Sequence, residues 1–181
     1  MKFRKIVEGI PVEDLYEEVM KNRDFFGHFP IRTTYPGSAH SQVVDVLLRG
    51  PEIRLGSTAQ DLQNTILCSD YPMMEEYPVL QSYLFTLMHM VRGTMLGRVV
   101  LTKLPPGGSI DPHKDEGEAA DLYDRYHIVV ASDNGNMFFS GEEQQEMLPG
   151  DIWWVDNHDI HWVENRGKED RIHVVCDIFR G

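Results

Sequence analysis

The sequence predicts a mainly β fold with N-terminal helices, in which a helical and loop layer packs on a C-terminal double-stranded β-helix, or jelly roll. After Gly97 the chain becomes a series of short β-rich runs that turn residues separate, whereas helix-compatible patterns lie before it. The length of 181 residues with 41% hydrophobic residues suits one domain with a sizeable core. We therefore expect a single domain over residues 1–181, with 1–96 as the helical and loop support and 97–181 as the jelly-roll core.

The N-terminal part contains patterns for two helices and one strand. The first helix is expected directly after Pro11, with acidic residues in its first turn and Lys21 near its end. Residues 25–42 are rich in Gly, Pro, His and aromatic residues, which indicates a loop. Residues 42–49 indicate a strand, and residues 73–91 indicate a helix that an internal proline starts or kinks.

The C-terminal part contains eight candidate strands at close and regular spacing. Many short strands of this kind indicate a sandwich or jelly roll, and they argue against a parallel α/β sheet. The candidate strands cover residues 97–104, 109–115, 125–132, 136–140, 143–148, 151–156, 160–165 and 171–179.

Charge and cysteine content exclude several classes of partner. The net charge of −12 argues against a nucleic-acid surface, which needs an excess of Lys and Arg, and against docking on anionic membranes. Cys68 and Cys176 lie far apart, so we expect reduced thiols and a cytoplasmic setting. The N-terminal residues lack the apolar run of a signal peptide, and no stretch is long and apolar enough to span a bilayer. The oligomeric state is not predicted.

A candidate metal site begins at His113-Lys114-Asp115. Residues i and i+2 of a strand point to the same face, so the imidazole and the carboxylate can reach one ion. Two such ligands and a distant second His form the facial triad of non-haem Fe(II) oxygenases, which leaves coordination positions open. The His-x-Asp motif alone is weak, because a solvated loop pair gives the same pattern.

The second histidine of the site is expected at His161, in an aromatic strand that follows a Pro-Gly turn. His161 and Asn165 are four residues apart, and this spacing resembles the second motif of cupin barrels. His158 is the competitor, but it lies three residues earlier and would face the opposite side of a strand. We interpret His158 as a residue of the loop or rim, and His173 as a buried barrel histidine within a β run.

Residues 102–177 resemble the aspartyl/asparaginyl β-hydroxylase branch of the Fe(II)- and 2-oxoglutarate-dependent oxygenases. In that family a Pro-Gly turn precedes the first metal histidine, an Arg-x-His segment follows, and a strand with the distal His and an Asn comes next. An Arg before an apolar strand that ends in Asp completes the pattern, ten residues after the distal His. The matching residues here are Pro106-Gly107 before His113, Arg125-Tyr126-His127, Val155-Asp156 through His161 and Asn165, and Arg171 through Asp177.

The resemblance implies that His113 and His161 are the two metal histidines. The mammalian members of this branch carry Gly where this chain has Asp115. Asp115 restores the two-His, one-carboxylate set of the wider superfamily, and we expect His113, Asp115 and His161 to be both the metal ligands and the catalytic centre. A carboxylate at this position also disfavours halogenation, which needs an open place for halide.

The resemblance also implies a binding site for 2-oxoglutarate. Arg171 matches the arginine that pairs with the distal carboxylate, and Thr102 matches a serine that assists it. Arg125 and His127 match the Arg-x-His pair that helps to hold the co-substrate. A planar guanidinium suits this role, because it binds a carboxylate through two parallel hydrogen bonds.

Taken alone, each arginine has a second interpretation. Arg171 could be an exposed residue at the start of a strand, since it follows Lys-Glu-Asp in the sequence. Arg125 could pair with Asp121 or Asp124 at the surface.

We therefore expect an Fe(II)- and 2-oxoglutarate-dependent dioxygenase that uses O2 and releases succinate and CO2. Its substrate is expected to be an Asp- or Asn-like peptide side chain or a small molecule, and not a nucleic acid. The first alternative is a non-redox, cupin-type metal-binding barrel, either an isomerase or a ligand-binding protein. The second is a structural protein with a degenerate site. Residues 25–30 and Arg32 are candidate walls of the substrate site, although these aromatics could equally pack on the barrel.

Overall fold

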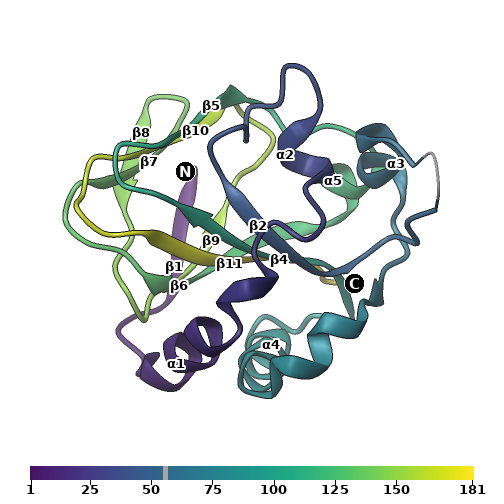
Figure 1. Cartoon of the computed structure of the whole chain (residues 1–181), viewed down its shortest axis with the longest axis horizontal. Coiled ribbons are helices and arrows are strands. Elements are labelled where there is room, and N and C mark those ends of the chain that lie inside the picture. Colours follow the sequence, from purple (N-terminus) through teal and green to yellow (C-terminus); the bar gives the residue numbers. More distant parts are fainter. Residues whose placement is uncertain (55–56) are drawn as a thin grey trace.

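The computed structural model describes residues 1–54 and 57–181 and contains two antiparallel sheets (Figure 1). In the seven-stranded sheet the strand order is β1 (Phe3–Val7), β9 (Ile152–Val155), β6 (Asp124–Ala131), β11 (Arg171–Phe179), β4 (Met95–Leu104), β2 (Val44–Gly50) and β3 (Ser69–Asp70). In the four-stranded sheet the order is β5 (Ser109–His113), β10 (His161–Asn165), β7 (Asn136–Ser140) and β8 (Glu143–Glu146). This architecture confirms the mainly β fold and the double-stranded β-helix.

The helices lie around the large sheet in two groups (Figure 1). α1 (Glu13–Lys21) and α4 (Pro78–Met90) contact each other and lie against one face of the large sheet. The short helices α2 (Ile31–Thr34), α3 (Ala59–Asn64) and α5 (Glu118–Leu122) lie together at another side, and 3-10 turns occur at Arg23–Phe25 and Pro72–Glu76. None of these helices, within the two described ranges, combines the length and apolarity that crossing a bilayer would require.

A buried carboxylate fixes α1 against the start of α4. Glu18 of α1 accepts hydrogen bonds from the backbone N–H groups of Val79 (2.8 Å) and Leu80 (2.9 Å). The first N–H groups of a helix have no partner within the helix, and a negative charge there is favourable. The sequence patterns for both helices are therefore confirmed, and Pro78 starts α4 as its first residue.

Side chains of the large sheet alternate between two environments, as the two-residue period of a strand requires. One set packs with α1 and α4 in the main core, and it includes Leu101 of β4, Ile128 of β6 and Val174 of β11. The next residues along the same strands, Thr102, Val129 and His173, face the inside of the jelly roll. The polar residues of the candidate site lie on this inner face.

Strands from the N-terminal part complete the large sheet. β1 was not anticipated, because FRKIV has charged residues in its middle, yet it pairs with β9 along one edge. β2 pairs with β4, as the predicted strand at 42–49 allows, and β3 extends the opposite edge. The jelly roll therefore takes three strands from residues before 96, in addition to the helical and loop layer that we expected there.

Candidate metal centre

His113, Asp115 and His161 meet where β5, an edge strand of the small sheet, pairs with β10. His113 ends β5, His161 begins β10, and the antiparallel register places the two residues opposite each other. Asp115 lies two residues beyond β5, and its backbone N–H donates to the carbonyl of Asn157 at 3.3 Å. One ligand atom from each of the three side chains lies within 4.8 Å of the others, so the group could hold a metal ion.

Backbone carbonyls fix the tautomer of both histidines. Nδ1 of His113 lies 2.8 Å from the carbonyl oxygen of Asp111, and Nδ1 of His161 lies 2.9 Å from that of Asp159. A carbonyl oxygen only accepts, so each Nδ1 carries the proton and each Nε2 keeps a free lone pair. Burial lowers the pKa of His161, which favours the neutral ring that a metal requires.

Asp115 is held through one of its two oxygens. Oδ2 accepts from Nη1 of Arg125 and lies 3.4 Å from Nδ2 of Asn157. Oδ1 lies 3.8 Å from Nε2 of His113 and is the oxygen that faces the histidine pair. Burial alone would raise the pKa of Asp115, but the charge of the Arg125 guanidinium holds it below its usual range. The carboxylate is therefore ionised and available as a ligand.

A chain of buried charges connects this carboxylate to the large sheet. Arg125 of β6 donates from Nε and Nη2 to the carboxylate of Asp177 on β11, at 2.9 and 3.2 Å. Arg98 of β4 donates from Nε to the same carboxylate at 2.9 Å. These two guanidinium groups outweigh the effect of burial and keep the pKa of Asp177 below its ordinary value.

A small inner cavity of about 40 Å³ adjoins the centre, and Arg171 and Thr102 line it together with His127 and Phe138. Arg171 is only 3% exposed, and burial lowers the pKa of its guanidinium to about 9. Within the described residues no carboxylate lies at ion-pair distance from Arg171. The buried Thr102 Oγ1 also has no hydrogen-bond partner there. The cavity thus presents a cation and a hydroxyl that lack an anionic partner, and a bound carboxylate would satisfy both.

The ring of His173 positions the Arg171 guanidinium through a hydrogen bond. Nη2 of Arg171 lies 3.1 Å from Nδ1 of His173, and Nδ1 of His127 lies 3.4 Å from the same atom. Because a guanidinium only donates, Nδ1 of His173 is the acceptor, and the ring is neutral with its proton on Nε2. Burial, with Arg171 as the next cause, lowers the pKa of His173 well below its ordinary value and favours this neutral form.

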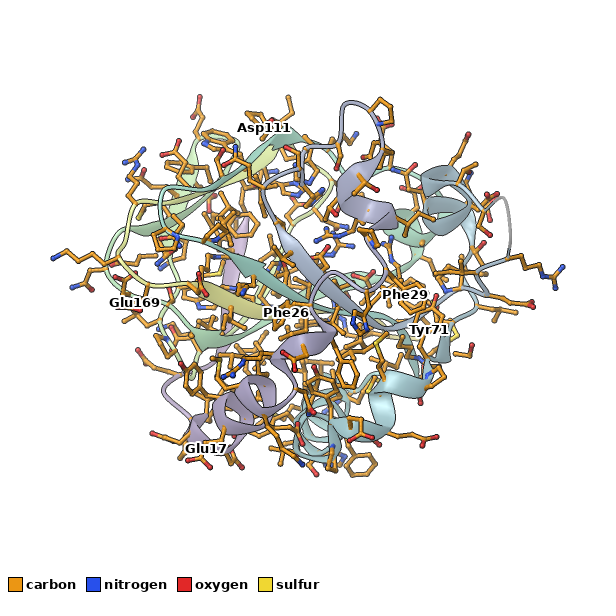
Figure 2. The ribbon with its side chains drawn as sticks, in the orientation of Figure 1. Glu17, Phe26, Phe29, Tyr71, Asp111 and Glu169 are labelled. Atoms are coloured by element: carbon orange, nitrogen blue, oxygen red, sulfur yellow. The ribbon has the colours of Figure 1, made fainter. Side chains whose placement is uncertain are left out.

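A larger outer cavity of about 280 Å³ also adjoins the centre. His113 and Asp115 line it, as do Arg32, Arg98 and the aromatic residue Phe29. Figure 2 shows Phe29 beside Tyr71, with which its ring stacks at 6.4 Å, on the flank of the molecule away from Asp111. The inner and outer cavities share Arg32, His40, His113, Arg125 and Val175, so they adjoin at the candidate metal centre.

The structure brings all seven predicted site residues together. The outer cavity is lined by Asp115, and the inner one by Thr102, His113, Arg125, His127, His161 and Arg171. The surface interpretations of the two arginines are wrong: Arg171 is buried, and Arg125 pairs with Asp115 and Asp177.

Of the other histidines, His158 is half-exposed and lies between Asp121 and Asp156, as expected of a rim residue. His173 is fully buried in the barrel, also as expected.

Sequence reasoning missed several neighbours of the centre. The His40 ring lies 4.7 Å from that of His113, although His40 stands in a loop without a spacing pattern. Asn157 and Arg98 also reach the site, through Asp115 and Asp177. The alternation along β4 could have found Arg98, because it lies four residues before Thr102 and on the same face. The positions of His40 and Asn157 depend on loop conformation, for which the sequence offers no comparable pattern.

The whole fold is shared with two prolyl hydroxylases. A prolyl-4-hydroxylase from Pseudomonas putida has a TM-score of 0.56 at 11% identity, over 99% of this chain and 93% of that one. A prolyl hydroxylase from Trichoplax adhaerens, in complex with a hypoxia-inducible factor peptide fragment, has a TM-score of 0.58 at 10% identity, over 99% and 84%. These two likenesses show that the chain has the fold of the prolyl hydroxylases.

The chain belongs to the aspartyl/asparaginyl β-hydroxylase family, whose model matches residues 69–181. The match covers the whole of the candidate site apart from the N-terminal wall of the outer cavity. A separate relative, the oxalate-binding protein of Thermotoga maritima, is 32% identical over 68 residues. That alignment covers 38% of this chain and 50% of the length of the relative.

Proposed function

We propose that the protein is an Fe(II)- and 2-oxoglutarate-dependent dioxygenase that hydroxylates its substrate and releases succinate and CO2. The observation that carries the proposal is Arg171, a buried guanidinium without a carboxylate partner in the described part of the chain, which lines a cavity beside the His-Asp-His cluster. A metal barrel that binds no carboxylate ligand has no need of such a group. Family membership and the fold of the prolyl hydroxylases support an oxygenase.

The residues fit the metal ion and the co-substrate in distinct roles. His113 and His161 would bind the metal through Nε2, and Asp115 would bind it through Oδ1. Iron held in this way would supply the activation of O2 and the oxidation of a C–H bond. Three protein ligands on one face of the metal ion leave its other coordination positions free for small molecules.

Arg171 would receive the distal carboxylate of 2-oxoglutarate, assisted by the Thr102 hydroxyl. The inner cavity has room for about three water molecules, enough for a carboxylate and the carbon next to it. The rest of the co-substrate would extend toward His127 and Arg125. All three nitrogens of Arg125 donate to Asp115 or Asp177. This arginine would therefore also hold the Asp115 carboxylate in position for the metal.

Two classes of substrate remain in the proposal, a peptide side chain of the Asp or Asn type and a small molecule. The peptide in the Trichoplax enzyme supports the first, and the outer cavity of about 280 Å³ suits the second. A screen of amino acids and peptides for stimulated succinate release would distinguish the two classes. Nucleic acid is not proposed, because the chain carries a net charge of −12.

The alternative function is a non-redox barrel that binds a small dicarboxylate. The similarity to an oxalate-binding protein favours it over other non-redox barrels, because Arg171 could also receive oxalate. The deciding experiment is a titration of the Mn(II)-loaded protein with 2-oxoglutarate and with oxalate, followed by a succinate assay with Fe(II) and O2. Metal-dependent binding of 2-oxoglutarate with succinate formation supports the oxygenase. Oxalate binding without succinate formation supports the alternative.

A further inference from the structure

The outer cavity contains three arginines that differ in how many of their donors are engaged. Each of the three nitrogens of Arg125 is engaged, because Nε and Nη2 donate to Asp177 and Nη1 donates to Asp115. Arg32 and Arg98 are each bound through Nε alone. Neither has a hydrogen bond from an Nη group to any residue in ranges 1–54 and 57–181.

A buried aspartate sets the orientation of each partly engaged arginine. Asp45, on the inner face of β2, is 5% exposed and accepts from Nε of Arg32 at 2.8 Å. Asp177, on β11, is 2% exposed and accepts from Nε of Arg98 at 2.9 Å. A guanidinium is planar, so an Nε held by the aspartate also fixes the plane in which the Nη N–H groups lie. The arginine side chains are 30% and 18% exposed and line the same cavity.

We propose that Arg32 and Arg98 form an anion-binding subsite in the outer cavity, and that the substrate of the enzyme carries a carboxylate that binds there. This inference rests on the proposed function, since it names the class of compound that the oxygenase accepts. The subsite is next to His113 and Asp115, so a compound held by its carboxylate would lie beside the metal centre.

The charges around the two cavities favour one additional negative charge. With a divalent ion and the 2-oxoglutarate dianion bound, four guanidinium groups (Arg32, Arg98, Arg125 and Arg171) and the ion would face three carboxylates (Asp45, Asp115 and Asp177) and the dianion. One positive charge remains, and a monocarboxylate neutralises it. The other charged residues of the outer cavity, Asp111, Lys114 and Glu116, are exposed, so water screens them.

The cavity walls favour a carboxylate with an aliphatic chain over a free inorganic anion. Ile31, Leu47 and Val100 supply an apolar surface beside the two arginines. Arginine binds a planar carboxylate through two parallel hydrogen bonds, and the chain of such a ligand would cover the apolar wall.

The test uses protein labelled with ¹⁵N and loaded with Zn(II) as a diamagnetic metal and with saturating 2-oxoglutarate. Butyrate is the probe, butyramide is its neutral counterpart, and ionic strength is held constant. The Nε–H signals of Arg32 and Arg98 should shift and saturate with butyrate but not with butyramide. Arg166 is the matched control, because its Nε also binds a carboxylate, that of Glu164 at 2.6 Å, but it is exposed.

Arg32→Gln and Arg98→Gln should each weaken butyrate binding at least about tenfold, as loss of a charge-assisted hydrogen bond predicts. Arg32→Lys should recover part of the affinity, because it restores the charge without the fork. Shifts that do not saturate, or that Arg166 shares equally, overturn the subsite. Inorganic phosphate binding tenfold tighter than butyrate overturns the assignment to carboxylates. The Arg171 signal separately reports whether 2-oxoglutarate binds, so failure of the proposed function is distinguishable.

Discussion

Replacing Arg171 by Met should separate co-substrate binding from metal binding. Burial lowers the pKa of Arg171 from 12.5 to about 9, and since a tenfold change in an equilibrium is about 1.4 kcal/mol, the penalty on the charged form is about 5 kcal/mol. A bound carboxylate can recover part of that penalty. Loss of the ion pair between Arg171 and the 2-oxoglutarate carboxylate should therefore weaken 2-oxoglutarate binding by roughly 2–5 kcal/mol, or about thirtyfold to several thousandfold in Kd.

The same change should stabilise the protein without ligand. Because the folded-state pKa is depressed, Arg171 destabilises the fold fully at pH values below 9, and the penalty decreases only as pH rises from there toward 12.5. Arg171→Met removes the penalty, and we expect an increase of about 1–3 kcal/mol in the free energy of unfolding at pH 7. Added 2-oxoglutarate should raise Tm of the wild type and leave that of the variant nearly unchanged.

The assay is calorimetric titration of the Mn(II)-loaded protein with 2-oxoglutarate, together with thermal unfolding. Arg166→Met is the control, because Cζ of Arg166 and of Arg171 each lies 5.9 Å from a phenylalanine ring centre, but Arg166 is exposed. Arg171→Lys should recover only part of the affinity. Equal 2-oxoglutarate affinity in wild type and Arg171→Met would refute the role of this arginine, and no binding by the wild type would refute the oxygenase.

Three further results are expected. His113→Ala or His161→Ala should abolish uptake of one equivalent of Mn(II), measured by titration, whereas His158→Ala should retain it; the reverse pattern would move the distal ligand to His158. Asp177→Asn should destabilise the fold by about 3–5 kcal/mol at pH 7. Because the pKa of Asp177 is lowered in the folded protein, its stabilising contribution is fully present above the ordinary value of 3.8. The gap in stability to wild type should therefore close only as pH falls below 3.8, and a gap independent of pH would contradict this. His173→Asn, which keeps an acceptor near Nδ1, should bind 2-oxoglutarate better than His173→Phe by about tenfold, and equal affinities would exclude a positioning role.

The strands of the jelly roll were predictable because turn residues mark where they end. The runs at 97–104, 136–140 and 171–179 match β4, β7 and β11 to within two residues. β1 was missed for a physical reason: it is an edge strand with Arg4 and Lys5 in its middle, and its main partner, β9, is almost 150 residues away. Only tertiary pairing shows that such a segment is a strand.

The grouping of His113, Asp115 and His161 could be predicted from the sequence, because short motifs mark these residues. His113 and Asp115 are two residues apart, and His161 stands at a recognisable distance from Asn165 and Arg171. The ion pairs that hold Asp115 in place could not be predicted from such motifs. Asp177 binds Arg125 because β11 pairs with β6 in a register that sets these two residues opposite each other. No pattern within either strand specifies that register.

The two sheets divide the candidate chemistry between them. The two candidate metal-binding histidines belong to β5 and β10 of the small sheet, whereas Arg98, Arg125 and Arg171 belong to β4, β6 and β11 of the large sheet. Asp115 is the point of contact, since it lies beside His113 and accepts a hydrogen bond from Arg125. Substitutions on the large sheet should therefore alter binding of anions while metal affinity persists, unless they act through Arg125. Arg125→Gln is the informative exception, because it leaves Oδ2 of Asp115 without its main donor, so it should weaken both Mn(II) and 2-oxoglutarate binding.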